Sequence, residues 1–336
     1  MFKSYRCEKL NKTLHFLPDK IKFCCSCAEG PGVVITDFSN IDKEEIIKEK
    51  KRIQKLLKRG IIPSVCKGCV DYKEIPLKER VLNLFSPQKD DFLVKHIIVD
   101  HFKQCDCKCI YCSQEQIYET KKQQYEILPL VKQLYASKMI DSYGLKAEFQ
   151  GGSISLLKEF DALMEEFYNH GCIDFVVLMN AIKYMPILEK IGCNEKSHIG
   201  ISLDCGCRET FQKIKGLDLF DETIENIKKL RANSNVHIEL KYIIIQGIND
   251  NIEELEKFLF IARNIGGIEP ISLEIDYRNT ILSQFEFKIP AHYYEMFDFA
   301  EQFCKKHNIL FCKTPHTSNL LKNGIYKPID CSDKSQ

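Results

Sequence analysis

The sequence predicts an α/β protein: a partial (β/α)6 barrel of the TIM type, preceded by a small N-terminal cysteine-rich domain. Three observations predict this arrangement. Apolar runs alternate with amphipathic stretches between residues 90 and 315, as expected for parallel βαβ units. Six cysteines gather in short groups within the first 85 residues. A chain of 336 residues is long enough to bury one large core together with a small satellite domain.

The cysteine-rich domain is predicted over residues 1–85. Within it, the segment 41–60 carries apolar residues at helical spacing and ends at Gly60, which predicts an amphipathic helix. The apolar positions are Ile46, Ile47, Ile53, Leu56 and Leu57. Its lysines are interspersed with glutamates, so we interpret the polar face as a solvated surface rather than an RNA-binding one.

The barrel is predicted over residues 90–315, and residues 316–336 form a C-terminal tail. The predicted strands are 93–102, 145–152, 173–180, 198–205, 236–247 and 270–276. Helical patterns separate them at 156–171, 185–192, 208–230 and 252–266, and a last one follows at 292–308. Asp250 and Glu253 form a capping-box pattern at the start of one helix. Chemistry in such barrels lies where strands end, and the first strand leads directly into a cysteine-rich loop.

Composition narrows the class of protein. The 48 basic and 47 acidic residues nearly cancel, so neither a nucleic acid nor a membrane surface is an expected partner. The N-terminus lacks an apolar signal core, and no stretch of about 18 apolar residues follows. We therefore expect a cytoplasmic protein. In that reducing compartment, 17 cysteines indicate metal ligation rather than a disulfide framework.

The most informative motif is the loop that contains Cys105, Cys109 and Cys112, with spacing CxxxCxxC and Tyr111 before the last cysteine. Three thiolates on one loop can ligate three irons of a four-iron four-sulfur cluster, which leaves the fourth iron open to a small molecule. A zinc site is the alternative, because CxxC pairs also bind zinc. Cys107 lies out of spacing and is not an expected ligand.

With this loop at the end of its first strand, the sequence resembles the radical S-adenosylmethionine superfamily. The resemblance implies that S-adenosylmethionine binds the open iron and is cleaved by one electron. The products are methionine and a 5′-deoxyadenosyl radical, which abstracts hydrogen from a substrate. It also implies a reducing partner such as flavodoxin or ferredoxin.

Further positions match the family in order along the chain. Gly151, Gly152 and Ser153 follow the second strand, where the family has a Gly-Gly-Glu stretch that binds the amino group of the cofactor. Glycines let a backbone approach a ligand closely. Ser153 departs from the family's pattern, because a serine lacks the charge of the carboxylate.

The third and fourth strands carry the other matches. Asn180 stands at the place of the family's strand-end Asn, and Ser202 and Asp204 are expected on one face of the fourth strand. The run from Ser202 to Gly216 also resembles family members. The resemblance implies that these side chains contact the cofactor and that Tyr111 lies against its adenine.

Two cysteines that follow Asp204 have a candidate catalytic role. Cys205 and Cys207 lie where a thiol could donate hydrogen to a substrate radical. The alternative is that both are small buried apolar residues.

Cys7, Cys24, Cys66 and Cys69 form a second set of four sulfur ligands. Their pattern resembles half of the SPASM and twitch domains, which bind auxiliary iron–sulfur clusters in this superfamily. Those domains usually follow the barrel, whereas this set precedes it. Cys25 and Cys27 are alternatives to Cys24, and a structural zinc is an alternative to a cluster.

The sequence thus predicts a radical S-adenosylmethionine enzyme with two four-iron four-sulfur clusters. A peptide or protein side chain is the favoured substrate, and a sugar or other small metabolite is the alternative. A non-enzymatic, zinc-stabilised binding protein is the rival class.

Overall fold

The structure of the protein is a computed structural model. It describes residues 3–24, 31–35, 43–66, 69, 72–79, 92–112, 125–172, 174–193, 196–279 and 285–326. Two compact units are present: residues 1–104 with 120–176, and residues 105–119 with 177–336. Strand β8 (Asp174–Met179) contains residues of both units. The expected linker near residues 85–90 lies outside the described residues, so the division into 1–85, 90–315 and 316–336 stays a prediction.

The first unit contains a mixed sheet. Its strands, in spatial order, are β4 (Gly32–Val34), β3 (Lys20–Lys22), β2 (Thr13–Phe16), β6 (His96–Val99) and β7 (Lys146–Phe149). The strands β2, β6 and β7 are parallel, whereas β3 and β4 are antiparallel additions. N-terminal residues therefore extend the sheet beyond β6, the first predicted barrel strand.

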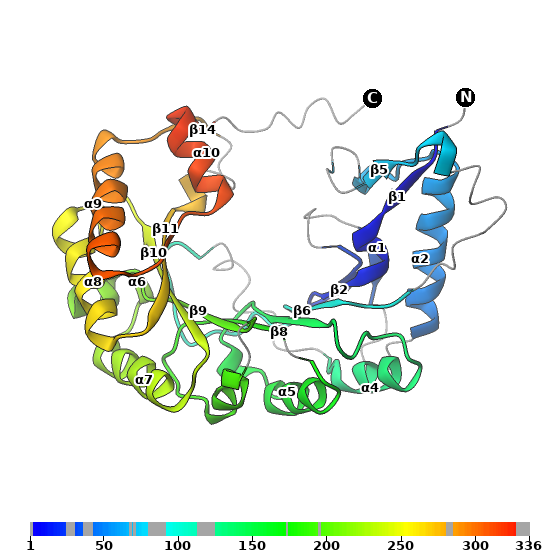
Figure 1. Cartoon of the computed structure of the whole chain (residues 1–336), viewed down its shortest axis with the longest axis horizontal. Helices are drawn as coiled ribbons and strands as arrows, with labels where there is room; N and C mark the ends of the chain where they lie inside the picture. The colour runs from blue at the N-terminus through cyan, green and yellow to red at the C-terminus, as the bar shows by residue number, and fades with distance from the viewer. Residues whose placement is uncertain are drawn as a thin grey trace. The chain divides into compact units, whose positions relative to one another are not determined.

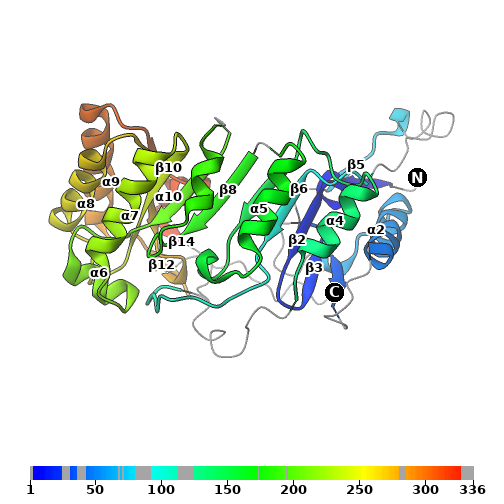
Figure 2. The same ribbon diagram turned by 90° about the horizontal axis from the view of Figure 1, so that it is seen from below.

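Helices cover one face of this sheet and bury its apolar residues. Figures 1 and 2 show α4 (Leu128–Ala136) and α5 (Phe160–Asn169) against one face. There the ring centroid of Phe149 lies 4.9 Å from that of Phe160 and 6.2 Å from that of Phe167. The helix predicted from segment 41–60 forms as α2 (Lys43–Lys58).

One lysine of α2 departs from the predicted solvated face. Lys50 is only 1 % exposed, and its Nζ lies 5.2 Å from the centroid of the Phe23 ring. Its described hydrogen bond goes to the Thr13 carbonyl, at 3.5 Å. Burial lowers the pKa of Lys50 to about 7.

The second unit contains a parallel sheet with helices on one side (Figure 1). Its strands are β9 (His198–Ser202), β10 (His237–Ile244), β11 (Ile268–Ile275) and β13 (Phe311–Cys312). Its long helices are α6 (Arg208–Lys215), α7 (Phe220–Asn233), α8 (Ile252–Ile265) and α9 (Ala291–His307). The predicted helix at 185–192 forms as the 3-10 helix η4 (Pro186–Cys193).

The predicted cap of α8 is wrong by one residue. Asn251, not Asp250, caps this helix, and its side-chain oxygen accepts a hydrogen bond from the Glu254 N–H at 2.9 Å. Asp250 instead accepts from the Gly247 N–H at 2.8 Å and lies 3.2 Å from His292.

The six predicted barrel strands are confirmed as β6 to β11, in the predicted order along the chain. The remaining elements are β1 (Tyr5–Cys7), α1 (Glu8–Lys12), η1 (Ser64–Cys66), β5 (Tyr72–Glu74), η3 (Ile154–Leu156), η5 (Tyr277–Asn279), β12 (Phe287–Lys288), α10 (Pro315–Asn323) and β14 (Ile325–Tyr326). Among the described helices, none has the length and apolar character needed to cross a membrane.

Gly152 is required by a close backbone approach. A Cβ atom at this position would lie 1.9 Å from the Gln104 carbonyl oxygen, which belongs to the segment that leads into the cysteine loop. The Ser153 N–H donates to the same oxygen at 2.8 Å. A side chain at position 152 therefore displaces main chain rather than a flexible neighbour.

We predict that Gly152→Ala lowers the free energy of unfolding by about 2 kcal/mol or more, because the clash involves backbone. Urea denaturation of this variant and of its control measures the loss of stability. Gly247→Ala is the matched control: Gly247 has a φ of +75° but no atom within 4 Å of the added Cβ, so it costs only about 1 kcal/mol of left-handed strain. Equal losses in both variants would contradict the clash.

Candidate functional site

The cysteine loop lies in the second unit and is anchored to the last turn of α6. The Lys108 N–H donates to the Lys215 carbonyl at 2.9 Å, and the Ile110 N–H donates to the Ile214 carbonyl at 3.0 Å. Within the loop, the Cys112 N–H donates to the Cys109 carbonyl at 3.0 Å. Backbone hydrogen bonds thus fix the part of the chain that carries the three predicted ligand cysteines.

The thiols of this loop are unequal. Cys107 is buried and hydrogen-bonds to both Cys105 and Cys109. Hydrogen bonding to Cys107 lowers the pKa of Cys105, and the same interaction, aided by the Lys215 ammonium, lowers the pKa of Cys109 to about 7. Burial and these hydrogen bonds raise the pKa of Cys107. Because the thiolate is the form that binds metals, the donor chemistry of Cys105 and Cys109 fits an iron–sulfur cluster.

Asn180, immediately after β8, contacts the cysteine loop. Its Nδ2 donates to Asp106 Oδ1 at 2.9 Å and lies 3.3 Å from Cys107 Sγ and 4.0 Å from Cys105 Sγ. The structure therefore brings this predicted cofactor residue next to two of the loop thiols.

A buried ion pair contacts the loop through Tyr111. Asp204 and Lys215 are both buried and form a salt bridge. The Tyr111 hydroxyl donates to Asp204 Oδ2 at 2.6 Å, and Lys215 Nζ donates to the Tyr111 hydroxyl at 2.8 Å and to the Ser202 carbonyl at 2.7 Å. The other carboxylate oxygen of Asp204 accepts from the Ile243 N–H at 3.0 Å. Both oxygens of Asp204 are thus bound within the protein.

The shared face predicted for Ser202 and Asp204 does not form. Strand β9 ends at Ser202, and Asp204 has a positive φ of 64°, so strand alternation does not extend to it. The carboxylate turns toward Lys215 instead. The roles of Tyr111, Ser202 and Asp204 toward S-adenosylmethionine stay predictions.

Two residues that hold the loop were missed by the sequence analysis. Lys215 has the sequence pattern of an ordinary helix lysine. Its one distinguishing signal is its position directly before Gly216. Gly216 caps α6 in the left-handed region and lies beside Lys108 of the loop. Arg278 donates to the Ile110 carbonyl and also pairs with Asp276. No local pattern identifies this contact, because 168 residues separate its partners.

The remaining predicted site residues make no described hydrogen bond to the cysteines of the loop. The Cys205 thiol donates to the Leu203 carbonyl at 3.3 Å, and the Cys207 thiol contacts Glu254 Oε2 at 3.4 Å at the start of α8. Their role as hydrogen donors stays a prediction. Gly151, Gly152 and Ser153 belong to the first unit, where both glycines make room for the segment 100–104. Their binding role also stays a prediction.

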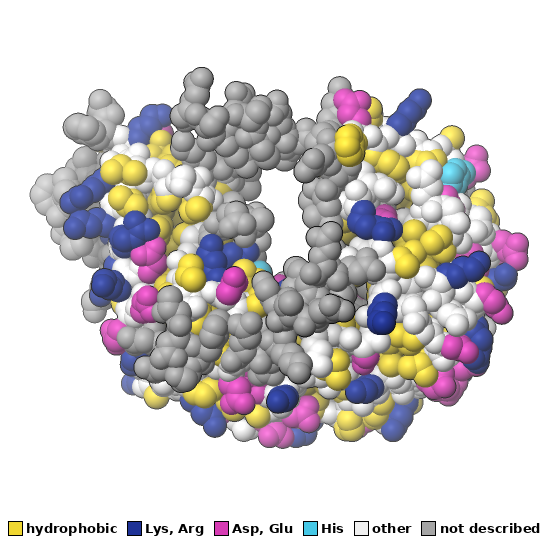
Figure 3. All heavy atoms as spheres, turned by 180° about the vertical axis from the view of Figure 1, so that it is seen from behind, with side chains coloured by type: hydrophobic (Ala, Val, Ile, Leu, Met, Phe, Trp, Pro, Cys, Tyr) yellow, Lys and Arg dark blue, Asp and Glu magenta, His cyan; other side chains and the backbone are white. Residues whose placement is uncertain are grey.

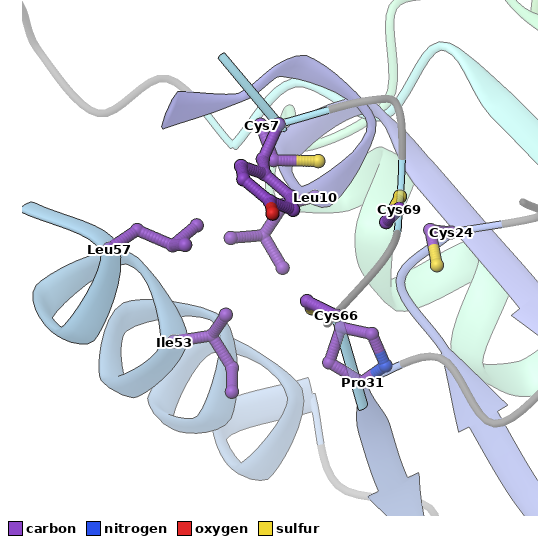
Figure 4. A pocket seen from close by; sticks show the side chains of 9 residues that line it. Cys7, Leu10, Cys24, Pro31, Ile53, Leu57, Cys66 and Cys69 are labelled. Carbon is purple, nitrogen blue, oxygen red and sulfur yellow. The ribbon is translucent and has the colours of Figure 1, made fainter. Parts of the chain in front are cut away.

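The four N-terminal cysteines surround one cavity in the first unit (Figure 4). Cys7 ends β1, Cys24 follows β3, and Cys66 and Cys69 belong to a turn in which the Cys69 N–H donates to the Cys66 carbonyl at 3.1 Å. The cavity has a volume of about 20 Å³ and is partly open to solvent. Its other walls come from Leu10, Pro31, Ile53, Leu57 and Tyr72.

The spacing of these sulfurs bears on what they could bind. Among the described residues, one group of possible metal ligands has all its ligand atoms within 4.8 Å of one another. It consists of Cys105, Asp106 and Cys107. No three of the four described N-terminal sulfurs form such a group. Tetrahedral zinc, with Zn–S bonds of about 2.3 Å, requires sulfurs about 3.8 Å apart. A four-iron cluster binds each sulfur to a separate iron, which suits a wider set. Cys25 and Cys27 lie outside the described residues.

The surface shown in Figure 3 carries lysine and arginine side chains interspersed with aspartates and glutamates. This mixture agrees with the formal net charge of +1.

Sequence comparison finds relatives for about half of the chain. A probable GTP 3′,8-cyclase of Saccharolobus islandicus is 26 % identical over 163 residues, which are 48 % of this chain and 51 % of the relative. The GTP 3′,8-cyclase of Clostridium botulinum is 25 % identical over 176 residues, or 51 % of this chain and 53 % of the relative. This chain thus spans about half the length of the curated relatives that it matches. No protein-family model matches it.

Comparison of structures finds the same fold in Streptococcus suis SuiB bound to its precursor peptide SuiA. The TM-score is 0.53 at 13 % identity, and the match covers 84 % of this chain and 63 % of SuiB. SuiB bound to S-adenosylmethionine matches with a TM-score of 0.52 at 12 % identity, over 80 % of this chain and 61 % of SuiB.

We predict that Lys215→Met lowers the free energy of unfolding by about 3–5 kcal/mol, because it leaves the buried Asp204 carboxylate without its counter-charge. Chemical denaturation checks this. Lys215→Met combined with Asp204→Asn removes both charges and should recover part of the loss. A single variant as stable as the wild type would show that the pair is not the support of the loop.

Proposed function

We propose, on the premise that this chain belongs to the radical S-adenosylmethionine superfamily, that it cleaves S-adenosylmethionine reductively and abstracts hydrogen from a peptide substrate. The observation that carries the proposal is the anchored loop with Cys105, Cys109 and Cys112 after strand β6. A reducing donor such as flavodoxin or ferredoxin supplies the electron. The cytoplasm suits these thiols, because it keeps them reduced.

The residues of the loop have distinct tasks. Cys105, Cys109 and Cys112 hold a four-iron four-sulfur cluster, and the contacts of Lys215 and Arg278 keep the loop in place. When bound, the cluster supplies one electron to S-adenosylmethionine, whose cleavage provides the radical that abstracts hydrogen. The protein binds and orients the cofactor and excludes water from it.

A peptide substrate is favoured by the likeness of fold to SuiB, whose structure contains a precursor peptide. A small metabolite is the second candidate, because the sequence relatives are named as cyclases of GTP. Substrate choice depends on loops that vary independently of the fold.

Cys7, Cys24, Cys66 and Cys69 hold a second four-iron cluster in this proposal. Three segments contribute the thiols to one cavity. No three of these four described sulfurs lie within 4.8 Å of one another, which favours a cluster over a single zinc ion. Such a centre would pass electrons or bind the substrate.

The first test is anaerobic reconstitution, followed by iron and sulfide analysis and dithionite-driven release of 5′-deoxyadenosine. We expect about eight irons per chain and release of the nucleoside. Cys109→Ala should lose about four irons and abolish release, whereas Cys304→Ala, a buried cysteine outside both sets, serves as the control. Zinc alone, with no nucleoside, would instead support a non-enzymatic binding protein.

The second test concerns the N-terminal centre. Replacing Cys66 and Cys69 together with alanine should lower the iron content from about eight to about four per chain. Metal analysis of the wild type and of this double variant measures the change. One zinc and about four irons in the wild type, with zinc lost in the variant, would refute the second cluster and leave the first intact.

A further inference from the structure

Strand β11 presents two polar side chains to the interior of the second unit. The ring of Tyr242 on β10 lies 5.0 Å from that of Phe258 on α8, so Tyr242 faces the helices. Its register partner on β11 is Leu273, which shares that face. Because strand residues alternate between faces, the flanking residues Ser272 and Glu274 point to the opposite side, away from α8 and α9.

Glu274 is held rigidly by one of its two oxygens. Glu274 Oε2 accepts hydrogen bonds from the Thr314 and Thr317 hydroxyls, both at 2.8 Å, and from the Tyr277 hydroxyl at 3.3 Å. Burial, with the nearby Glu274 charge, raises the pKa of Tyr277 to about 12, so Tyr277 keeps its proton at neutral pH. The carboxylate is thus fixed in position by three hydroxyl groups.

The other oxygen of Glu274 is left without a hydrogen-bond partner by the part of the chain that the structure describes. The residue is 2 % exposed and Ser272 is 3 % exposed. Neither Glu274 Oε1 nor Ser272 Oγ has a hydrogen-bond partner among the described residues. Two buried polar atoms on one face of a strand are therefore left unsatisfied, which costs free energy until a ligand supplies the missing bonds.

The charge around these atoms favours a cation. The described hydrogen bonds to Glu274 come from neutral hydroxyls. Lys241 is the register partner of Ser272 on β10, but no described ion pair joins it to Glu274. Glu239 adds negative charge beside Tyr277. The nearby His316 has its pKa lowered by burial, so it is neutral at pH 7. A buried carboxylate without a counter-charge is best completed by a hydrogen-donating cation.

Glu274 lies close in the sequence to residues that contact the cysteine loop. Asp276 lies two residues further along the chain, and it pairs with Arg278, which donates to the Ile110 carbonyl of the loop. Two residues of extended strand span about 6.6 Å. The unsatisfied oxygen thus belongs to the same part of the second unit as the residues that support the loop.

We infer that Glu274 and Ser272 form a binding site for a primary ammonium group of the substrate. The site takes a protonated amine, which donates to Glu274 Oε1 and to Ser272 Oγ, while Thr314, Thr317 and Tyr277 hold the carboxylate. The assignment of this ligand to the substrate rests on the proposed function, whereas the binding itself does not.

The test measures binding of n-butylammonium and of 1-butanol, its neutral counterpart, to the reconstituted full-length protein at matched ionic strength. Saturation-transfer NMR titration gives both dissociation constants. We expect roughly tenfold tighter binding of the ammonium, since a hydrogen bond to a charged group contributes about 1.5 kcal/mol or more. Glu274→Gln should remove this preference, and Ser272→Ala should reduce it about threefold.

Glu253→Gln is the matched control, because Glu253 is an exposed glutamate of α8 that pairs with Lys257, and it should keep the preference. Iron content and circular dichroism establish that each variant is folded. Equal affinity for the two probes in the wild type, or a preference that survives in Glu274→Gln, overturns the inference. Failure of the proposed function is distinguishable, because it is seen as absence of 5′-deoxyadenosine release whatever the probes do.

Discussion

The buried ion pair between Asp204 and Lys215 is the interaction on which the candidate site depends. It joins the end of β9, the end of α6 and, through Tyr111, the cysteine loop. Such a pair costs desolvation and is stable only when its remaining hydrogen-bonding groups are satisfied. Here the Ile243 N–H and the Ser202 carbonyl supply the missing partners. The loop is consequently positioned by groups that do not themselves bind metal.

The two sets of cysteines are built in different ways. Cys105, Cys109 and Cys112 lie on one short loop, which backbone hydrogen bonds to Ile214 and Lys215 at the end of α6 hold in place. The N-terminal set comes from separate segments, and its cavity exists only because α2 packs beside those segments with Ile53 and Leu57 in its wall. In the loop site a single segment carries all the thiols, whereas the assembled site requires separate segments to meet before its thiols come together.

The buried charged groups differ in how fully their hydrogen bonds and counter-charges are supplied. Asp204 is fully paired and serves the architecture. Glu274 is fixed on one oxygen and unsatisfied on the other, a state that costs stability and is therefore expected where a ligand binds. Lys50 is buried over an aromatic ring and forms no ion pair with a carboxylate among the described residues, and nothing in the structure explains this placement.

The sequence by itself determined the six alternating strands, helix α2, the three-cysteine loop and the resemblance to a known superfamily, because periodicity and short motifs are local properties of the chain. Only the tertiary structure decided which groups meet across long separations. Asp204 turned from the expected strand face toward Lys215, β2 extended the sheet beside β6, and Thr314 met Glu274, 40 residues away. These contacts depend on strand register and on backbone conformations such as the positive φ of Asp204, which no local pattern encodes.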